Sequence, residues 1–421
     1  MPPAATPLPH DHHLSPAAFT LSRREFVAMM ASLMALNALA IDTMLPAFPV
    51  IRDALGIADA NAVQFIISVY LLGSGVGALA YGPLADRYGR KPIVMGAVAA
   101  YAGFSIMCAA STSFSWLLWG RLLQGLAAAA LAVVVVSIIR DRFSGDRMAS
   151  LLSLIYIIFM AVPAVAPLIG QVIADLAGWR AIFYLLAVVA GVMAAWVAIR
   201  LPETLTADNT VPIDGKSIVP MWTAVMTNRV GLLYIIGAGT IMGALFGFIN
   251  SAQQIVGDAF GRPDLFPYTF AVVAGALALA NFTNSRIVEK FGARRVSHAA
   301  MFAFIVLSCA QIAADLWAPG NLWLFVVLLS VNMSMVAFIG SNFGSIAMQP
   351  FARGAGAASS FQTFVRTVLA AGLGAVIGQQ FDGSPLPLSV SFLLAGLACL
   401  GLVLAAERGR LFKRRSVPQA I

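Results

Sequence analysis

The fold is decided by the stretch Gly82-Pro83-Leu84-Ala85-Asp86-Arg87-Tyr88-Gly89-Arg90-Lys91-Pro92, which stands between two apolar runs and has a counterpart in the second half of the chain. The counterpart is Ser285-Arg286-Ile287-Val288-Glu289-Lys290-Phe291-Gly292-Ala293-Arg294-Arg295. When Gly89 is aligned with Gly292, Asp86 falls on Glu289 and Lys91 falls on Arg294. The sequence therefore predicts two related halves in tandem.

The composition is that of a membrane protein. Of 421 residues, 60 % are hydrophobic and 10 % are charged, whereas soluble proteins have about 25 % charged residues. Crossing the bilayer takes about 20 apolar residues in a helix. Apolar runs that approach or exceed this length lie at 26–50, 62–83, 92–112, 114–138, 150–173, 181–200, 230–254, 266–285, 297–317, 321–345, 356–380 and 387–406. We expect an all-α polytopic membrane protein with twelve transmembrane helices in two pseudo-symmetric six-helix bundles.

The positive charges predict the orientation. Of the 26 Lys and Arg residues, only Arg52, Arg180 and Arg262 fall in odd-numbered connections, and Arg121 and Arg366 fall inside apolar runs. All the others lie on the opposite side, which the positive-inside rule makes cytoplasmic. We therefore expect both termini in the cytoplasm of a bacterial inner (plasma) membrane protein. The net charge of +8 then favours contact with anionic lipid rather than with nucleic acid.

The polar segments predict the domain boundaries. We expect a disordered cytoplasmic tail at 1–22, an N-terminal bundle at 23–202, a cytoplasmic linker at 203–228, a C-terminal bundle at 229–406 and a basic cytoplasmic tail at 407–421. Within the linker, Asp214-Gly215-Lys216-Ser217 resembles the end of a phosphate-binding loop, but Thr210 stands where the first glycine is needed. We expect no ATP-driven transport, no cofactor, no metal site and no enzyme activity.

Asp42 is the one acid that lies far from the ends of the apolar runs. A charge at that depth costs about 2.5 to 3.5 kcal/mol, and intramembrane acids commonly serve proton or ion pathways. We therefore predict that Asp42 is a proton or ion site that faces a cavity. The alternative is an acid tied to a structural arginine.

Arg121 is the predicted partner of Asp42. Each lies about two turns in from the outer end of its helix, so the two share a depth. Gln124, three residues after Arg121, lies on the same helix face. Burial favours the neutral form of Asp42, whereas a nearby guanidinium favours the ionised form. The pair is therefore predicted to perform the proton coupling.

The duplicated charged stretch predicts a conformational gate. Its glycines allow a tight cytoplasmic turn, and Asp86 can meet the opposing half or a helix N-terminus when the halves close. Plain topology anchoring is the alternative. The predicted gate consists of Gly82, Asp86, Arg87, Gly89, Arg90, Lys91, Glu289, Gly292 and Arg294.

The fifth span carries Pro163 and Pro167, followed by Gly170. Each proline removes a backbone donor, which predicts a bend or a stiff contact surface, with packing alone as the alternative. Arg366 in the eleventh span could bind an anionic or carbonyl group of a substrate, or donate to backbone carbonyls at a bend. The other candidates for the substrate cavity are Gln124, Asn37, Tyr70, Tyr156, Met160, Asn250, Gln253 and Asn332.

These motifs together resemble a known family. The stretch from Gly82 to Lys91, Arg121-x-x-Gln124-Gly125, the proline-glycine run that ends at Gly170, and Leu201-Pro202-Glu203-Thr204 are similar to the drug/proton antiporters of the major facilitator superfamily. Asp42-x-x-x-Pro46-Ala47-x-Pro49, Asn284-Ser285-Arg286, and Gly356-Ala357-Ala358-Ser359-Ser360 leading to Arg366 resemble the bicyclomycin and chloramphenicol resistance (Bcr/CflA) branch. Three positions depart from the pattern: Ala166 and Gln171 stand where the antiporter motif usually has glycines, and Met34 stands where some related exporters carry a second acid.

The resemblance implies a proton-coupled secondary transporter that exports small, largely apolar compounds by alternating access. It is driven by the proton gradient, and its partners are a small-molecule substrate, protons and the lipid bilayer; we expect a monomer. The alternative is a proton-coupled uptake symporter or facilitator for a sugar or organic acid on the same scaffold.

Overall fold

The computed structural model describes residues 21–143, 145–205, 215–351 and 355–412. Within these ranges it has twelve helices long and apolar enough to cross a membrane, which confirms the predicted fold class. The predicted tail at 1–22 and basic tail at 407–421 fall mostly outside the described residues, as does linker segment 206–214.

The helices of the first half are α1 (Arg23–Asp42), α2 (Phe48–Ala54), α3 (Phe65–Tyr88), α4 (Arg90–Ala109), α5 (Phe114–Arg142), α6 (Gly145–Ala177) and α7 (Trp179–Arg200). The second half has α9 (Arg229–Gln254), α10 (Phe266–Phe291), α11 (Ala293–Trp317), α12 (Leu322–Met348), α13 (Ala355–Gln379) and α14 (Leu386–Glu407). Between them, α8 (Gly215–Thr227) makes part of the expected linker helical and packs against α9 and α13.

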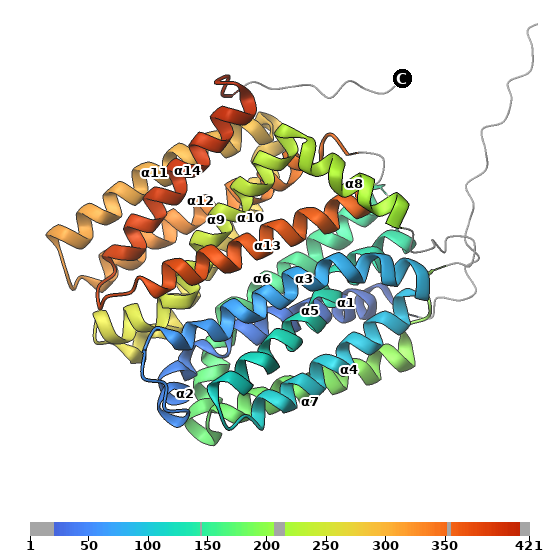
Figure 1. Ribbon diagram of the computed structural model, residues 1–421, viewed down its shortest axis with the longest axis horizontal. Helices are drawn as coiled ribbons and strands as arrows, with labels where there is room; N and C mark the ends of the chain where they lie inside the picture. The colour runs from blue at the N-terminus through green and yellow to red at the C-terminus, as the bar shows by residue number, and fades with distance from the viewer. Residues whose placement is uncertain (1–20, 144, 206–214, 352–354, 413–421) are drawn as a thin grey trace, which may run out of the picture.

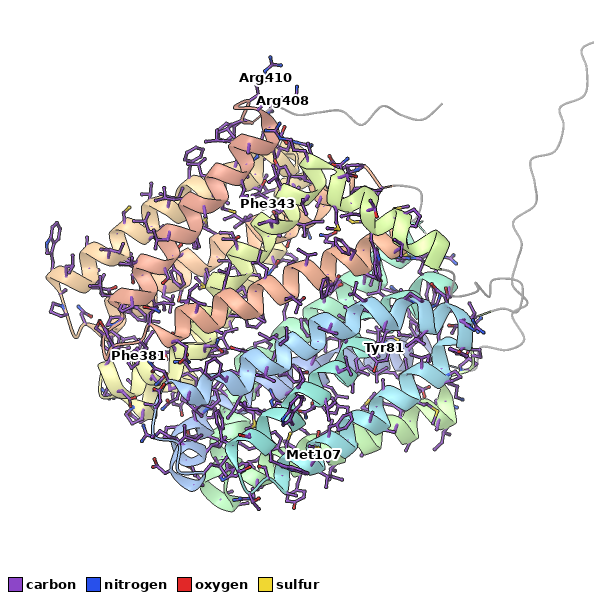
Figure 2. The ribbon with its side chains drawn as sticks, in the orientation of Figure 1. Tyr81, Met107, Phe343, Phe381, Arg408 and Arg410 are labelled. Carbon is purple, nitrogen blue, oxygen red and sulfur yellow. The ribbon has the colours of Figure 1, made fainter. Side chains whose placement is uncertain are left out.

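The two halves repeat one packing pattern. In the first half α1 packs on α6, α3 on α5 and α4 on α7; in the second, α9 packs on α13, α10 on α12 and α11 on α14. The halves meet where α3 runs beside α13 and where α6 contacts α10 (Figure 1). Arg408 and Arg410 lie at one end of the second half, and Phe381 lies at the opposite end of that half (Figure 2).

The charged stretch from Gly82 to Pro92 does not form a loop. Helix α3 continues to Tyr88, α4 begins at Arg90, and Gly89 alone makes the reversal with φ of 100°. Gly292 does the same between α10 and α11, with φ of 84°. Residues with a Cβ rarely adopt such positive φ values, so the two glycines compress each predicted turn into one residue.

The first span is broken in its outer third. Pro46 has no N–H to donate to the Asp42 carbonyl, so α1 ends at Asp42. The chain continues through the 3₁₀ turn Leu45–Ala47 into α2. The break places the Asp42 side chain at the end of a helix within the bundle.

Candidate functional site

Small residues bring α3 and α5 into direct backbone contact. A Cβ added at Gly73 or Gly77 of α3 would collide with the backbone of Leu122 or Leu126 in α5. A Cβ at Gly125 would likewise collide with the Tyr70 carbonyl. Close helix approach of this kind is typical of small-residue interfaces in membranes. It brings the Arg121 side chain within reach of the α3 backbone.

Arg121 is fully buried, and its hydrogen bonds stay within the first half. Its Nε donates to the Ile66 carbonyl (3.1 Å), one terminal nitrogen donates to Gln124 Oε1 (2.6 Å) and the other to the Ala40 carbonyl (3.0 Å). Its guanidinium lies 4.3 Å from the Tyr70 ring centroid. The predicted ion pair with Asp42 is therefore wrong: Arg121 holds the backbone of α1 two residues before the acid.

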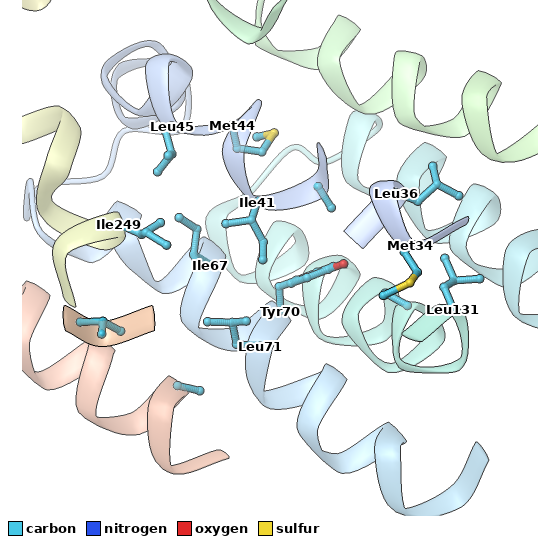
Figure 3. Close-up of a cluster of buried hydrophobic side chains, with 14 of the residues drawn as sticks. Met34, Leu36, Ile41, Met44, Leu45, Ile67, Tyr70, Leu71, Leu131 and Ile249 are labelled. Carbon is cyan, nitrogen blue, oxygen red and sulfur yellow. The ribbon is translucent and has the colours of Figure 1, made fainter. Parts of the chain in front are cut away.

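Asp42 is 4 % exposed. Its carboxylate makes no hydrogen bond or ion pair with any residue that the structure describes, and neither oxygen is fully occluded. The alternative of an acid tied to a structural arginine thus fails as well. Apolar side chains surround this level of the bundle, with Ile41 and Met44 beside Asp42 in sequence and Ile67 and Ile249 from α3 and α9 nearby (Figure 3). Such a carboxyl group is suited to gaining and losing a proton, because no fixed countercharge holds its ionised form.

Gly170 supports the helix break at Asp42. A Cβ at Gly170 would collide with the Thr43 carbonyl, so α6 touches α1 directly at the residue after the acid. Pro163 and Pro167 lie earlier in α6, which continues as a helix through both prolines. The proline-glycine run is thus joined to the acid by backbone contact, which sequence spacing alone did not predict.

Two predicted cavity residues are bound up inside the first half instead. Gln124 is fully buried and donates to Ser105 Oγ (2.7 Å) while it accepts from Arg121. Tyr70 is also fully buried, and its hydroxyl donates to Asn37 Oδ1 (2.7 Å). Because the polar groups of Gln124 and Tyr70 are already satisfied, these two residues position the helices around Asp42 rather than line an open cavity.

Arg366 contrasts with Arg121. It forms no hydrogen bond or ion pair with the described part of the chain, so the alternative in which it donates to backbone carbonyls is wrong. Its guanidinium interacts electrostatically with Tyr156 of α6, whose side chain is 41 % exposed. Met160, one turn further along α6, is half-buried. Arg366 and Tyr156 come from different halves, and they remain candidates for contact with a substrate.

Hydrogen bonds between side-chain amides and their neighbours join the outer ends of the two halves. We call the four residues that supply these amides the outer latch: Asn61, Gln64, Gln254 and Gln379. The Asn61 amide donates to the Gln379 and Phe381 carbonyls (3.3 and 2.8 Å), Gln254 Nε2 donates to Asn61 Oδ1 (2.9 Å), and Gln64 donates to Gln254.

Asn250 lies beside this latch and donates to Ser68 Oγ of the other half (3.1 Å). It is therefore part of a closed contact rather than of a cavity wall, contrary to prediction. Gln253 and Asn332 are buried too, and Asn332 donates to Ser308 Oγ (3.1 Å) inside the second half.

The predicted gate also differs in its contacts. Arg90 pairs with Asp86 (2.5 Å) and Asp141 (2.9 Å), and Glu203 accepts from the backbone N–H groups of Arg90 and Lys91 (2.9 and 3.1 Å). Asp86, Arg90, Lys91 and Asp141 belong to the first half, and Glu203 follows its last helix by three residues. Asp86 therefore does not meet the opposing half in this conformation; it ties α3 to α4 while Glu203 caps the start of α4.

The remaining gate residues lie close to the helix ends. Arg87 lies over the Tyr88 ring, with its guanidinium carbon 5.3 Å from the ring centroid, and Glu289 is exposed near the end of α10. Gly82 approaches the second half, because a Cβ added there would lie 3.0 Å from Ser360 Oγ of α13.

The second half has a buried charged cluster that the sequence analysis missed. Arg294 pairs with Glu407 (2.7 Å), and Tyr234 donates to Glu407 (3.0 Å) and contacts His298 Nε2 (3.0 Å). Glu407 closes the twelfth helix much as Glu203 follows the sixth, and this repetition was a usable signal. The cluster fastens the ends of α9, α11 and α14 together.

Comparisons with known proteins agree with this architecture. Residues 30–375 match the family model described as Major Facilitator Superfamily. A bicyclomycin resistance protein homolog of Haemophilus influenzae is 28 % identical over 356 residues, covering 84 % of this chain and 89 % of the relative. A chloramphenicol resistance protein of Pseudomonas aeruginosa is 28 % identical over 320 residues, covering 73 % of each chain.

Among solved structures, a D-xylose-proton symporter has a TM-score of 0.72 with 13 % identity, covering 93 % of this chain and 99 % of the other. At this identity the likeness shows the fold alone. The family match spans most of the chain and both halves of the repeat, and it confirms the resemblance stated from the motifs. This multi-pass membrane protein belongs to the Major Facilitator Superfamily.

Proposed function

We propose that the protein is a proton-coupled exporter of small, largely apolar compounds that works by alternating access of its two halves. The resistance proteins among its relatives support the export of drug-like molecules. The observation that carries the proton coupling is the carboxyl group of Asp42 at the break of α1, which has no partner in the described part of the chain. An ionised acid with no countercharge at that depth is costly, so Asp42 is protonated in this arrangement.

The structure around Asp42 supports the coupling of its protonation to movement. Arg121 holds α1 through the Ala40 carbonyl, and Gly170 holds it through contact at Thr43. Loss of the proton creates a charge that favours water and a wider cavity over close packing. Asp42 therefore biases the position of α1 against α5 and α6, which is the differential interaction that a conformational switch requires.

The energetics suit export by one proton per cycle. Each pH unit across the membrane supplies about 1.36 kcal/mol per proton, which is enough for about tenfold accumulation. A membrane potential adds about 2.3 kcal/mol per 100 mV for each charge moved. One carboxyl group with a neutral substrate makes the cycle electrogenic.

The same proposal includes location and assembly. The charge distribution supports a bacterial inner membrane protein with both termini in the cytoplasm. Each half supplies six of the twelve spans, and the halves pack against each other through α3 and α13 and through α6 and α10, which supports a monomer as the working unit.

Proteoliposomes loaded with a pH-sensitive dye test the proposal, with chloramphenicol and bicyclomycin as the first compounds. Added compound should drive proton release from the wild-type protein, and Asp42→Asn should abolish this release. Asp53→Asn is the matched control, because Asp53 lies on the same span with a side chain that is 71 % exposed. Proton release that survives in Asp42→Asn would refute the assignment. Uptake rather than extrusion in vesicles of known orientation would replace export by symport.

A further inference from the structure

Arg366 is a cation inside the bundle that has no hydrogen-bond or ion-pair partner among the residues that the structure describes. It lies eleven residues into α13, about 16 Å along the helix from Ala355. The α13 side chains next to it are used in packing: Val368 lies against Gly75 of α3, and Leu369 lies against Gly239 of α9. The Arg366 side chain takes part in neither contact. Its nitrogen atoms make no hydrogen bond to the described residues, and none of them is fully covered, so the guanidinium is accessible to a ligand. A charge of this kind is costly in a membrane protein unless a ligand or a cavity accounts for it.

Tyr156 faces Arg366 from the other half. It lies fourteen residues before Gly170, which is almost four helical turns, so the two residues share a face of α6. Gly170 on that face packs against α1 inside the bundle. The 41 % exposure of Tyr156 is therefore exposure toward the interior and not toward lipid. The Tyr156 phenol ring and the Arg366 guanidinium thus interact electrostatically across the two halves, and the described residues cover neither side chain completely.

The chemistry of this pair selects its ligand. A guanidinium presents a planar fork of donors that matches a carboxylate, and a charged hydrogen bond in a dry site is strong. The exposed ring of Tyr156 offers an apolar face for an aromatic or alicyclic body. Arg121, the other intramembrane arginine, is already satisfied by Ala40, Ile66 and Gln124. A single guanidinium that is left unbonded by the described residues suits one negative charge rather than a dianion.

We infer that Arg366 and Tyr156 form a subsite for a singly charged carboxylate carried on an apolar ring system. This inference rests on the proposed transport function, because it names the class of exported compound: amphiphilic organic acids bound through their acid group. Asp42 lies nineteen residues into α1, about 28 Å from its start, so the substrate anion and the exchanged proton occupy different depths.

A matched pair of fluorescent probes tests the subsite. Dansylglycine carries a carboxylate, and dansylglycinamide differs only in having a neutral amide there. Binding to the purified full-length protein in a neutral detergent is measured from the rise in dansyl fluorescence. We expect the wild type to bind dansylglycine at least about tenfold more tightly than the amide, as one charged hydrogen-bond pair can provide.

Arg366→Gln should remove this preference, and it should change dansylglycinamide binding by less than about threefold, which also shows that the variant is folded. Arg366→Lys should keep part of the preference because it keeps the charge without the fork. Arg180→Gln is the control, since Arg180 lies in the first turn of α7 and donates to the Ser111 carbonyl. That variant should bind both probes as the wild type does.

Three results would overturn the inference. The first is a wild type that shows no preference for the carboxylate probe, and the second is an Arg366→Gln variant that loses affinity equally for both probes. The third is displacement of dansylglycine by dioctanoyl phosphatidylglycerol at a tenfold lower concentration than by unlabelled naphthalene carboxylate. The last result would assign the subsite to a lipid headgroup. These measurements involve no proton flux, so they stand apart from the Asp42→Asn assay. A carboxylate preference without coupled proton release would refute the proposed function and leave the subsite.

Discussion

The separation of Arg121 from Asp42 predicts the outcome of a double-mutant cycle. Arg121→Met removes three donors from the Ala40 carbonyl, the Ile66 carbonyl and Gln124 Oε1 at a site with no exposure. Leaving a buried acceptor without a partner costs about 1 to 3 kcal/mol. We expect Arg121→Met to lower the free energy of unfolding by about 3 to 5 kcal/mol. Asp42→Asn breaks no hydrogen bond and should change it by less than about 1 kcal/mol.

The informative quantity is the coupling between the two substitutions. If Arg121 and Asp42 formed a buried ion pair, removing the arginine would leave a bare charge, and Asp42→Asn in that background would restore about 3 to 5 kcal/mol. Residues that share no direct contact have effects that add within about 0.5 kcal/mol. The structure therefore predicts that Asp42→Asn has the same small effect with and without Arg121.

Unfolding in mixed micelles of dodecyl maltoside and increasing sodium dodecyl sulfate, followed by tryptophan fluorescence, gives the four free energies. Gln124→Leu is a useful companion, because it removes one partner of Arg121 without touching α1. A coupling larger than about 2 kcal/mol between Asp42 and Arg121 would contradict the geometry described above. It would return the arginine to the role of a direct charge partner.

Three further predictions concern packing, the outer latch and the driving force. Gly170→Ala should impair transport severely, because the new methyl group meets the Thr43 backbone. Gly103→Ala is the control and should not impair transport, because its Cβ would meet no heavy atom within 4 Å. Counterflow rates compare the two variants, and equal rates would contradict the contact between Gly170 and Thr43. Asn61→Ala removes three hydrogen bonds of the outer latch, worth about 1 kcal/mol each. In an otherwise cysteine-free protein that carries Ser68→Cys, maleimide should therefore label this cysteine at least about tenfold faster. An unchanged labelling rate would show that the latch does not hold the outer side closed. Export of dansylglycine should respond more steeply to an inside-negative potential than export of dansylglycinamide, because exchange of an anion for a proton moves two charges and not one. The export rate of each compound is measured over a series of potassium diffusion potentials. Equal slopes of export rate against potential would refute this prediction.

The twelve spans were predictable because the bilayer demands length and apolarity, and both can be read from the residues themselves. Their boundaries were less so. Helix α3 continues five residues beyond the end of its apolar run, to Tyr88, because the end of a membrane helix can carry charge once it leaves the hydrocarbon. The break after Asp42 could have been predicted from Pro46, whose missing donor falls four residues after the acid.

The partners of the charged residues could not be predicted in the same way. Equal depth made an ion pair between Arg121 and Asp42 reasonable, but depth says nothing of the direction in which a side chain points around its helix. The carbonyl groups that satisfy Arg121 carry no sequence signal, since every residue has one. Asp86 shows the same limit, because both Arg90, at the start of the next helix, and the opposing half were available to it by sequence.

The two halves share a packing motif, but only the first half carries the acid to which we assign the proton. Ile169-Gly170-Gln171 in α6 recurs as Ile377-Gly378-Gln379 in α13, and each glycine stands against the outer part of its half's first helix. Gly170 meets the Thr43 carbonyl beside Asp42, whereas a Cβ at Gly378 would lie 3.0 Å from the Cβ of Asn250. The packing is thus repeated while the chemistry is not: one half carries a group that can lose a proton, and the other carries an amide that can only hydrogen-bond. Asn250 donates a hydrogen bond to Ser68 of the other half. The second half therefore helps to close the outer side at the depth where, in the proposed cycle, Asp42 of the first half exchanges its proton. In the proposed cycle, the repeat supplies two similar bundles that rock against each other, and the difference between Asp42 and Asn250 supplies the asymmetry through which a proton gradient would drive them.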